Sequence, residues 1–177
     1  MGSRWIVYFR RLREIFTNMK ILFVGWGRAG KDEAAAFLAK YTGLRYAGSF
    51  SWAALPYMAA RLGIHPQLAW ETRHQNRELW KSYCDELRRV DQTLLARMAL
   101  QSGDICAGLR DQIELEAVKS ARLFDRIVWI DREGTPEDVT VTFCRNHPAI
   151  DDWIPNHGTL EDFHWQIQMW ANTEGLR

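Results

Sequence analysis

The chain has 177 residues, of which 47% are apolar, and this length and composition suit one domain with a sizeable core. The formal net charge of +1 gives no overall field that favours nucleic acid or a membrane surface, and no apolar run approaches the roughly 18 residues that a membrane span needs. The three cysteines are an odd number without metal-ligand spacing, which favours a reducing, cytoplasmic location. The five histidines show no metal-ligand spacing either.

Residues 1–18 form a basic amphipathic segment with four arginines and one acidic residue. Its apolar side chains share one helical face: Trp5, Tyr8, Phe9, Leu12, Ile15 and Phe16. Such a helix can lie on a membrane or a nucleic acid, or act as a targeting sequence. It can also pack on its own domain, or extend the chain ahead of a start at Met19. We expect packing or extension, and therefore a single domain over residues 19–177.

The stretch from Lys20 to Asp32 contains the most specific motif. Residues 20–24 are a short apolar run typical of a buried strand, and apolar residues recur at helical spacing from Ala34 onward. Between them lies a loop that matches G-x-x-x-x-G-K: Gly25, Trp26, Gly27, Arg28, Ala29, Gly30 and Lys31. Its backbone N–H groups would converge on phosphate oxygens, and Lys31 would reach the terminal phosphates. We expect a nucleotide-binding loop, although a plain glycine-rich turn gives the same pattern.

The position after the lysine departs from this motif, which usually has Ser or Thr there to ligate Mg²⁺. Asp32 and Glu33 follow instead. Carboxylate oxygens suit Mg²⁺, so both acids are candidate metal ligands. They could equally be helix-start residues that the helix dipole favours.

Further strands and helices follow in alternation. Strands are expected at residues 44–47, 104–108, 126–130 and 153–154. Residues 51–101 read as a helical insert with breaks near 63–66 and 88–91, which we interpret as a substrate-binding subdomain and not as another crossover. Helices are also expected at residues 112–123, with Ile113, Leu115, Ala117 and Val118 largely inside, and after the capping box that begins at Thr159, with Leu160, Phe163, Ile167 and Trp170 inward.

Residues 131–152 are polar and irregular, so we expect them to supply little core and to act as a lid-like loop over a site. Strand–helix units repeated around buried strands predict a three-layer α/β/α fold with a five-stranded parallel sheet. Ligands in such sheets bind at the carboxyl ends of the strands, so the glycine loop, Arg110, Arg132 and Asn156 should share one face.

Transfer of a phosphoryl group needs positive charge around the phosphate oxygens, correct positioning and a metal. Arg110 follows a buried strand beside the glycine loop, which makes it the strongest candidate after Lys31. Other candidates are Ser51 at the start of the insert, Arg88 and Arg89 at a helix end within it, and Arg132 and Arg145 in the polar segment. For each of these arginines, an ordinary surface position is the alternative.

Three segments together resemble the bacteriophage-type deoxynucleoside monophosphate kinases. The run from Gly25 to Asp32 looks like their nucleotide loop, many of which carry an acid after the lysine. Residues 107–116 are similar to their D-x-R-x-x-x-E segment, in which the arginine, here Arg110, binds substrate phosphate. Residues 154–161 resemble the I-x-N-x-G-[ST]-L-E segment shared with dephospho-coenzyme A kinases, which places Asn156 and Gly158 at the donor adenine.

The resemblance implies a P-loop kinase fold that uses ATP and Mg²⁺ to convert a (deoxy)nucleoside monophosphate into its diphosphate. Lys31, Arg110 and Arg132 would be catalytic, in the host cytoplasm if a phage encodes the chain. Glu33 and Gly108 stand where the family has a hydroxyl and an acid, so two positions near Mg²⁺ are altered. Two alternative functions stay open: phosphorylation of 5-hydroxymethyluracil in DNA, and nucleotide binding without catalysis. The oligomeric state also stays open, and a homodimer is one option.

Overall fold

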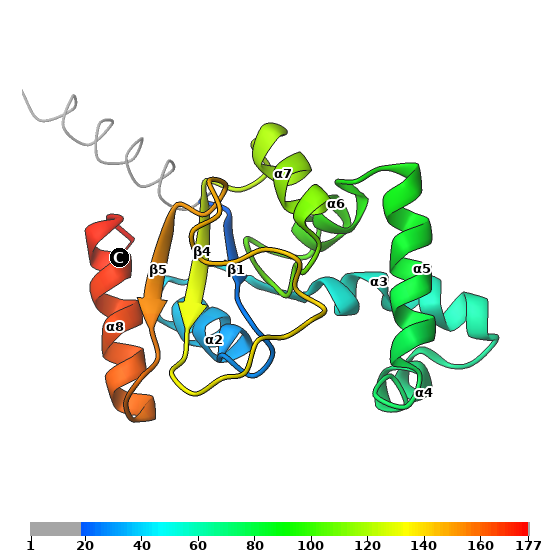
Figure 1. Cartoon of the computed structure of the whole chain (residues 1–177), viewed down its shortest axis with the longest axis horizontal. Coiled ribbons are helices and arrows are strands. Elements are labelled where there is room, and N and C mark those ends of the chain that lie inside the picture. The colour runs from blue at the N-terminus through cyan, green and yellow to red at the C-terminus, as the bar shows by residue number, and fades with distance from the viewer. Residues whose placement is uncertain (1–18, 177) are drawn as a thin grey trace, which may run out of the picture.

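The structure is a computed structural model and describes residues 19–176 (Figure 1). The basic segment at residues 1–18 lies outside the described residues, so its expected packing or extension stays a prediction. No helix among residues 19–176 is long and apolar enough to cross a membrane.

Five parallel strands form one sheet in the order β2-β3-β1-β4-β5. The strands are β1 (Ile21–Val24), β2 (Tyr46–Ser49), β3 (Ile105–Ala107), β4 (Arg126–Asp131) and β5 (Asp152–Pro155). The predicted α/β class and five-stranded parallel sheet are therefore confirmed. The second strand begins two residues later than predicted, and its pairing with β3 shifts register between Tyr46 and Gly48.

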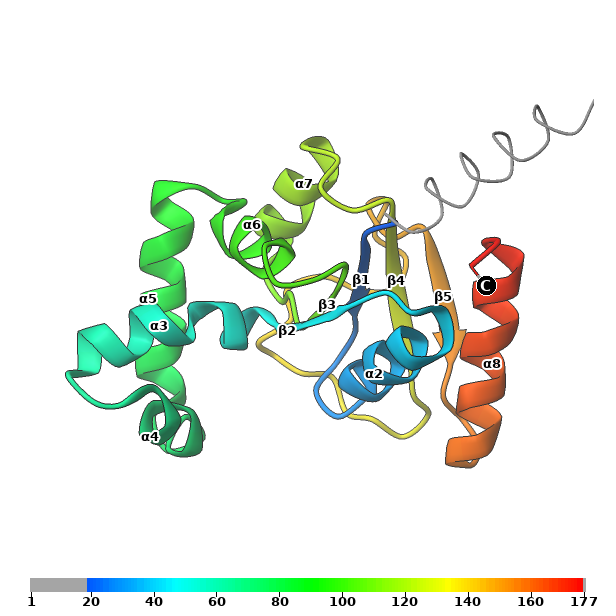
Figure 2. The same cartoon turned by 180° about the vertical axis from the view of Figure 1, so that it is seen from behind.

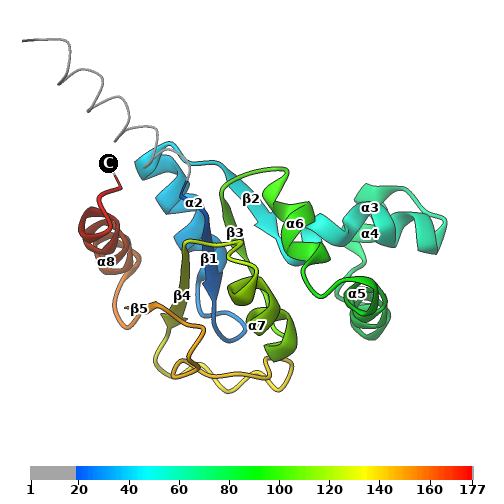
Figure 3. The same cartoon turned by 90° about the horizontal axis from the view of Figure 1, so that it is seen from above.

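Helices cover both faces of this sheet, as a three-layer fold requires (Figure 3). One face packs against α2 (Lys31–Thr42) and α8 (Leu160–Thr173), and the other against α6 (Leu94–Leu100) and α7 (Gln112–Ser120). Alternate residues of β1 separate into the two cores: Ile21 and Phe23 belong to the first, and Leu22 and Val24 to the second. This alternation makes the strand apolar on both faces, which is why it reads as a continuous apolar run.

The helical insert between β2 and β3 comprises α3 (Phe50–Leu62), α4 (Pro66–Glu71), α5 (Arg77–Val90) and α6. Helices α3 to α5 extend away from the sheet (Figure 2), whereas α6 buries Leu95, Ala96 and Ala99 in the core. The connection between β2 and β3, which pair in parallel, is therefore a crossover, contrary to the interpretation of the insert, whereas a substrate-binding role of its helices stays a prediction. Helix α6 makes the crossover that returns the chain to the sheet, as a connection between parallel strands requires.

Residues 132–151 contain no helix or strand. The sequence predicts that this segment supplies little to the hydrophobic core, but three of its side chains are buried there. Val141, Phe143 and Ala149 are buried, and Phe143 lies edge-on to Trp129 of β4 with ring centroids 6.1 Å apart. Figure 3 shows this segment running from β4 to α7 and back to β5. At α7 the Thr142 backbone N–H donates to the Arg110 carbonyl at 2.9 Å, which fixes the segment beside the end of β3.

Two predicted inward positions are also wrong: Ile113 is 61% exposed and Leu160 is 57% exposed. Both lie in the first turn of a helix whose buried face is set by later residues, Leu115 and Val118 in α7 and Phe163 and Ile167 in α8. At about 100° per residue, Ile113 lies roughly 140–160° from Leu115 and Val118, outside their face. Leu160 lies within about 60° of Phe163 and Ile167, on their face, but it is the first residue of α8, where the helix end leaves it exposed.

Candidate functional site

The glycine loop connects β1 to α2 at the carboxyl edge of the sheet, in the predicted strand–loop–helix order. Gly25 and Gly30 have φ values of +139° and +102°, a region that side chains with a Cβ rarely adopt. A Cβ at Gly25 would lie 2.7 Å from the Ile130 carbonyl oxygen, and one at Gly30 would lie 2.7 Å from Asn156 Nδ2. The loop therefore packs so closely on neighbouring strand ends that both positions need glycine.

Two residues from neighbouring strand ends support this loop through its carbonyl groups. Arg132, after β4, donates from Nη1 to the Arg28 carbonyl oxygen at 3.2 Å. Asn156, after β5, donates from Nδ2 to the Ala29 carbonyl oxygen at 2.9 Å. The expectation that these residues share one face with the loop agrees with these contacts. In this structure both side chains donate hydrogen bonds to backbone carbonyl groups of the loop.

Lys31 folds back over its own loop. Its Nζ donates to the Gly25 carbonyl at 2.9 Å and to the Trp26 carbonyl at 2.5 Å. Burial, together with the nearby charge of Arg110, lowers the pKa of Lys31 to about 8, although Asp32 and Asp138 oppose the shift. Burial leaves the Lys31 ammonium poorly solvated. An anion that binds beside it would stabilise the charged form and raise the pKa of Lys31 again, so Lys31 is well placed to bind an anion.

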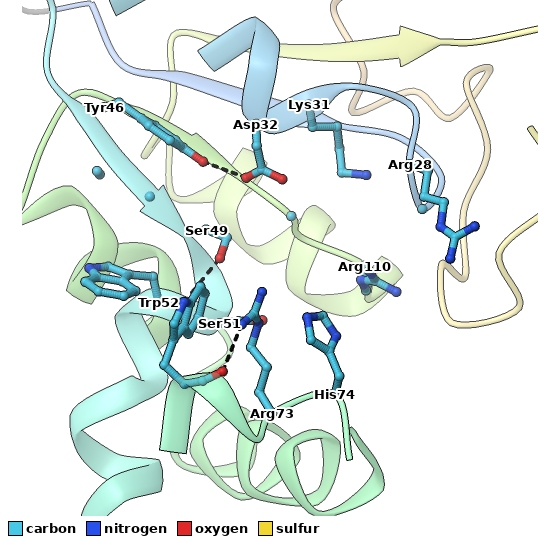
Figure 4. A pocket seen from close by; sticks show the side chains of 15 residues that line it. Arg28, Lys31, Asp32, Tyr46, Ser49, Ser51, Trp52, Arg73, His74 and Arg110 are labelled. Atoms are coloured by element: carbon cyan, nitrogen blue, oxygen red, sulfur yellow. Dashed lines mark hydrogen bonds between the residues drawn. The ribbon is translucent and has the colours of Figure 1, made fainter. Parts of the chain in front are cut away.

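Asp32 and Glu33, the two candidate metal ligands, point in different directions. Asp32 lines a cavity and accepts a hydrogen bond from Tyr46 Oη at 2.6 Å (Figure 4). Glu33 Oε1 lies 2.7 Å from His164 Nε2 on α8, and Glu33 does not line that cavity. Of the two acids, only Asp32 faces the space beside Lys31. In the described part of the chain, no three His, Cys, Asp or Glu side chains gather into a metal cluster.

The cavity beside the loop has a volume of about 540 Å³, within the range of small-ligand pockets. Figure 4 shows two groups of basic side chains facing it from different parts of the fold. Arg28, Lys31 and Arg110 come from the sheet edge, and Arg73 and His74 from the insert. Such a concentration of donors suits a ligand with several negative charges.

Arg110, in the loop after β3, is bound by the polar segment. Its Nη1 donates to Asp138 Oδ2 at 2.9 Å and also contacts the Thr140 hydroxyl. Asp138 further accepts a hydrogen bond from the Gly27 backbone N–H. Burial alone would raise the Asp138 pKa, but hydrogen bonds from Thr140, the charge of Arg110 and the Gly27 N–H hold it below its usual value. Asp138 is therefore a charged carboxylate between the glycine loop and Arg110.

A second cavity of about 390 Å³ lies on the far side of Arg110. The two cavities share five lining residues: Ser51, Arg73, His74, Gly108 and Arg110. Arg88, on α5, lines the second cavity, where its guanidinium contacts Asp85 and Glu114. Burial raises the pKa of Glu114 to about 8, even though the charge of Arg88 opposes the shift.

The remaining candidates lie away from both cavities. Arg89 is exposed at the end of α5 and lines neither of them. Arg145 pairs with Asp131 at 2.9 Å and stacks over the Trp153 ring. Gly158 sits in the turn before α8, where a Cβ would lie 2.7 Å from the capping carboxylate of Asp162.

Sequence reasoning missed four residues that line the cavities, Tyr46, Trp70, Arg73 and His74, and it also missed Asp138, which binds Arg110. Their segments carry no motif, and only the tertiary fold places them beside the glycine loop. Glu114 belongs to the segment that resembles D-x-R-x-x-x-E, but no role could be assigned to it from spacing alone.

Comparison with protein-family models and with curated proteins finds no match to this chain. Any function must therefore be argued from the site itself, and the kinase resemblance stays a proposal.

Proposed function

We propose that this chain is a phosphotransferase that uses ATP to convert a (deoxy)nucleoside monophosphate into the diphosphate. The observation that carries the proposal is the relation between the glycine loop and Arg110. Lys31 and Arg110 line the same cavity at the carboxyl edge of a parallel sheet, Lys31 after the loop that follows β1 and Arg110 in the loop that follows β3. Such an edge is where α/β proteins bind their ligands, and two separate cationic groups suit two separate phosphate groups.

In this proposal the loop backbone and the N-terminus of α2 bind the ATP phosphates, and Lys31 moves from the Gly25 and Trp26 carbonyls to the terminal phosphate. Arg110 binds the acceptor phosphate. An acceptor phosphate oxygen attacks the γ-phosphorus, the bond from that phosphorus to the β–γ bridging oxygen breaks, and ADP leaves. Arg28 and Arg132, at the loop, add positive charge for the phosphate oxygens in the transition state.

Mg²⁺ accompanies ATP in this class of reaction, where it neutralises charge on the β- and γ-phosphates. This ion is commonly held by one or two carboxylates together with substrate phosphates. Asp32 fits that requirement because its carboxylate faces the cavity beside Lys31. Glu33 does not fit, because His164 binds its carboxylate on the side of α8.

Transfer of label from radioactive ATP tests the proposal, with the full chain, Mg²⁺ and each of the deoxynucleoside and ribonucleoside monophosphates. We expect a labelled diphosphate with at least one of them. Arg110→Ala should lose transfer while ATP affinity stays within a few-fold, and Lys31→Ala should lose both. Lys40→Ala, an exposed lysine in the last turn of α2, is the matched control for Lys31.

Other results would support one of the alternatives. Label that enters DNA containing 5-hydroxymethyluracil, and no free nucleotide, would make a polymer the acceptor. ATP binding without transfer to any acceptor would leave a nucleotide-binding module. The contact of Asp138 with Arg110 is the observation that favours this module, since it engages the residue proposed to hold the acceptor.

A further inference from the structure

The second cavity, of about 390 Å³, adjoins the cavity of the glycine loop at Arg110. It opens from the cavity of the glycine loop and shares Arg110 with it, so a nucleotide held at Arg110 by its phosphate can extend into this space. Its lining includes the apolar side chains of Phe50, Trp80 and Leu95, which come from the insert. Flat aromatic and apolar surfaces of this kind suit the faces of a nucleobase.

One wall of this cavity carries a largely buried polar pair, Arg88 and Glu114. Glu114 on α7 is 1% exposed, and its Oε2 lies 3.4 Å from Arg88 Nη1 on α5. The other carboxyl oxygen, Oε1, is buried and has no hydrogen-bond partner among the described residues. Arg88 is also anchored by Asp85, whose Oδ1 lies 2.6 Å from Nη2.

A buried acceptor without a partner is costly, and most such groups in proteins are satisfied. Here the unpaired oxygen belongs to a residue that lines a cavity and stands beside a guanidinium, which can only donate. The pair therefore presents a donor next to an acceptor. A ligand that satisfies both needs an acceptor next to a donor.

We propose that this cavity holds the base of the acceptor nucleotide, and that Arg88 and Glu114 select a keto base: guanine, thymine or uracil. These bases carry a carbonyl oxygen beside a ring N–H, so Arg88 donates to the oxygen and Glu114, as a carboxylate, accepts from the N–H. Burial keeps a proton on Glu114 in the free protein, so binding of a keto base releases that proton to solvent. Adenine and cytosine present an amino group and a bare ring nitrogen at that edge, which would oppose donor to donor and acceptor to acceptor. The inference rests on the proposed function, because Arg110 must hold the acceptor phosphate.

Calorimetric titration of the full chain with dGMP, dTMP, dAMP and dCMP tests base selection without any variant. We expect dGMP or dTMP, or both, to bind at least about tenfold more tightly than dAMP and dCMP, which is the discrimination expected of a good bidentate pair. Equal affinity for all four, or preference for an amino base, would overturn the inference and leave the proposed function standing. If ATP binds but none of the four does, the proposed acceptor is wrong and the inference fails with it.

Two substitutions locate the selection. Glu114→Gln and Arg88→Gln should each reduce the preference for keto bases at least about fivefold, without changing ATP affinity. Glu116→Gln, an exposed glutamate on the same helix, and Arg122→Gln, an exposed arginine after that helix, are the matched controls. If the cavity variants keep the wild-type preference, or lose no more of it than the controls, then the pair does not read the base. Thermal melting of each variant separates a loss of selection from a loss of folding.

Discussion

Arg110 and Asp138 form a salt bridge that joins the end of β3 to the polar segment, with Nη1 2.9 Å from Oδ2. The same carboxylate accepts the backbone N–H of Gly27 in the glycine loop. Asp138 thus contacts the two groups that we propose to bind phosphate, the loop backbone and Arg110. A carboxylate between two phosphate-binding groups acts as an internal competitor, so a phosphate that binds there must displace it.

Removing this charge should strengthen nucleotide binding. In Asp138→Asn we expect the affinity for ATP or for the acceptor monophosphate to rise by up to roughly fivefold, the upper range for a partly exposed ion pair. Calorimetry with each ligand separately would measure it. Glu137→Gln, an exposed neighbour with the same change in charge, is the control. Weaker binding in Asp138→Asn would show instead that the carboxylate assists the ligand, for example through a bound metal.

Lys31 makes nucleotide binding depend on pH. Its pKa is about 8 in the free protein, so at pH 8.5 the amine is largely neutral. Bound phosphates favour the ammonium, and binding at pH 8.5 should therefore take up a large part of one proton, whereas at pH 6.5 uptake at Lys31 should vanish. Affinity for ATP should accordingly fall as the pH rises above 8.

Calorimetry at both pH values, in buffers with different enthalpies of ionisation, counts the protons. Lys31→Arg should bind without uptake at pH 8.5, because arginine stays charged throughout this range. Equal uptake by wild type and Lys31→Arg would assign the proton to another group.

The two acids that follow Lys31 have different surroundings, so their substitution should have different effects. Asp32 faces the cavity, where its carboxylate would repel the phosphates of metal-free ATP. Two like charges about 4 Å apart, at an effective dielectric constant near 20, repel each other by roughly 4 kcal/mol, which is an upper bound for this repulsion. Asp32→Asn should therefore bind metal-free ATP more tightly than wild type does, while Mg²⁺-dependent transfer falls. Glu33→Gln makes the same change in charge at a carboxylate bound to His164, and should alter neither property. Similar behaviour of the two variants would remove Asp32 from the candidate metal site.

The sequence predicts the parts of the site that follow buried strands. An apolar run followed by glycine identifies β1 and its loop, and Arg110 is found because it comes directly after another such run. Helical spacing predicts the insert, but it cannot show that α6 packs on the sheet while α3 to α5 extend away from it. That division depends on which apolar face finds a partner in the folded chain.

Asp138 shows why the rest could not be predicted. It lies in a polar segment without periodicity, and it reaches Arg110 because Phe143 packs on Trp129 and Thr142 binds the Arg110 carbonyl. The hydrogen bond from Tyr46 to Asp32 likewise joins β2 to α2, two segments that only the fold brings together. Contacts of this kind are set by tertiary packing, and local sequence patterns carry no signal for them.

Glu114 should make the stability of the fold depend on pH. Burial raises its pKa from the ordinary 4.5 to about 8, against the opposing charge of Arg88 and with smaller support from Asp111 and Asp85. The folded state holds this proton up to about pH 8, whereas the unfolded chain releases it near pH 4.5. The contribution of Glu114 to the free energy of unfolding is therefore fully present below pH 4.5 and is lost as the pH rises to about 8.

Glu114→Gln cannot ionise, so between pH 5 and pH 8.5 its stability should rise relative to wild type by at least about 1.4 kcal/mol, the equivalent of one pKa unit. Urea denaturation of both proteins at the two pH values would measure this, with Glu116→Gln as the exposed control on the same helix. A stability difference between Glu114→Gln and wild type that is the same at both pH values would mean that Glu114 stays ionised in the folded protein.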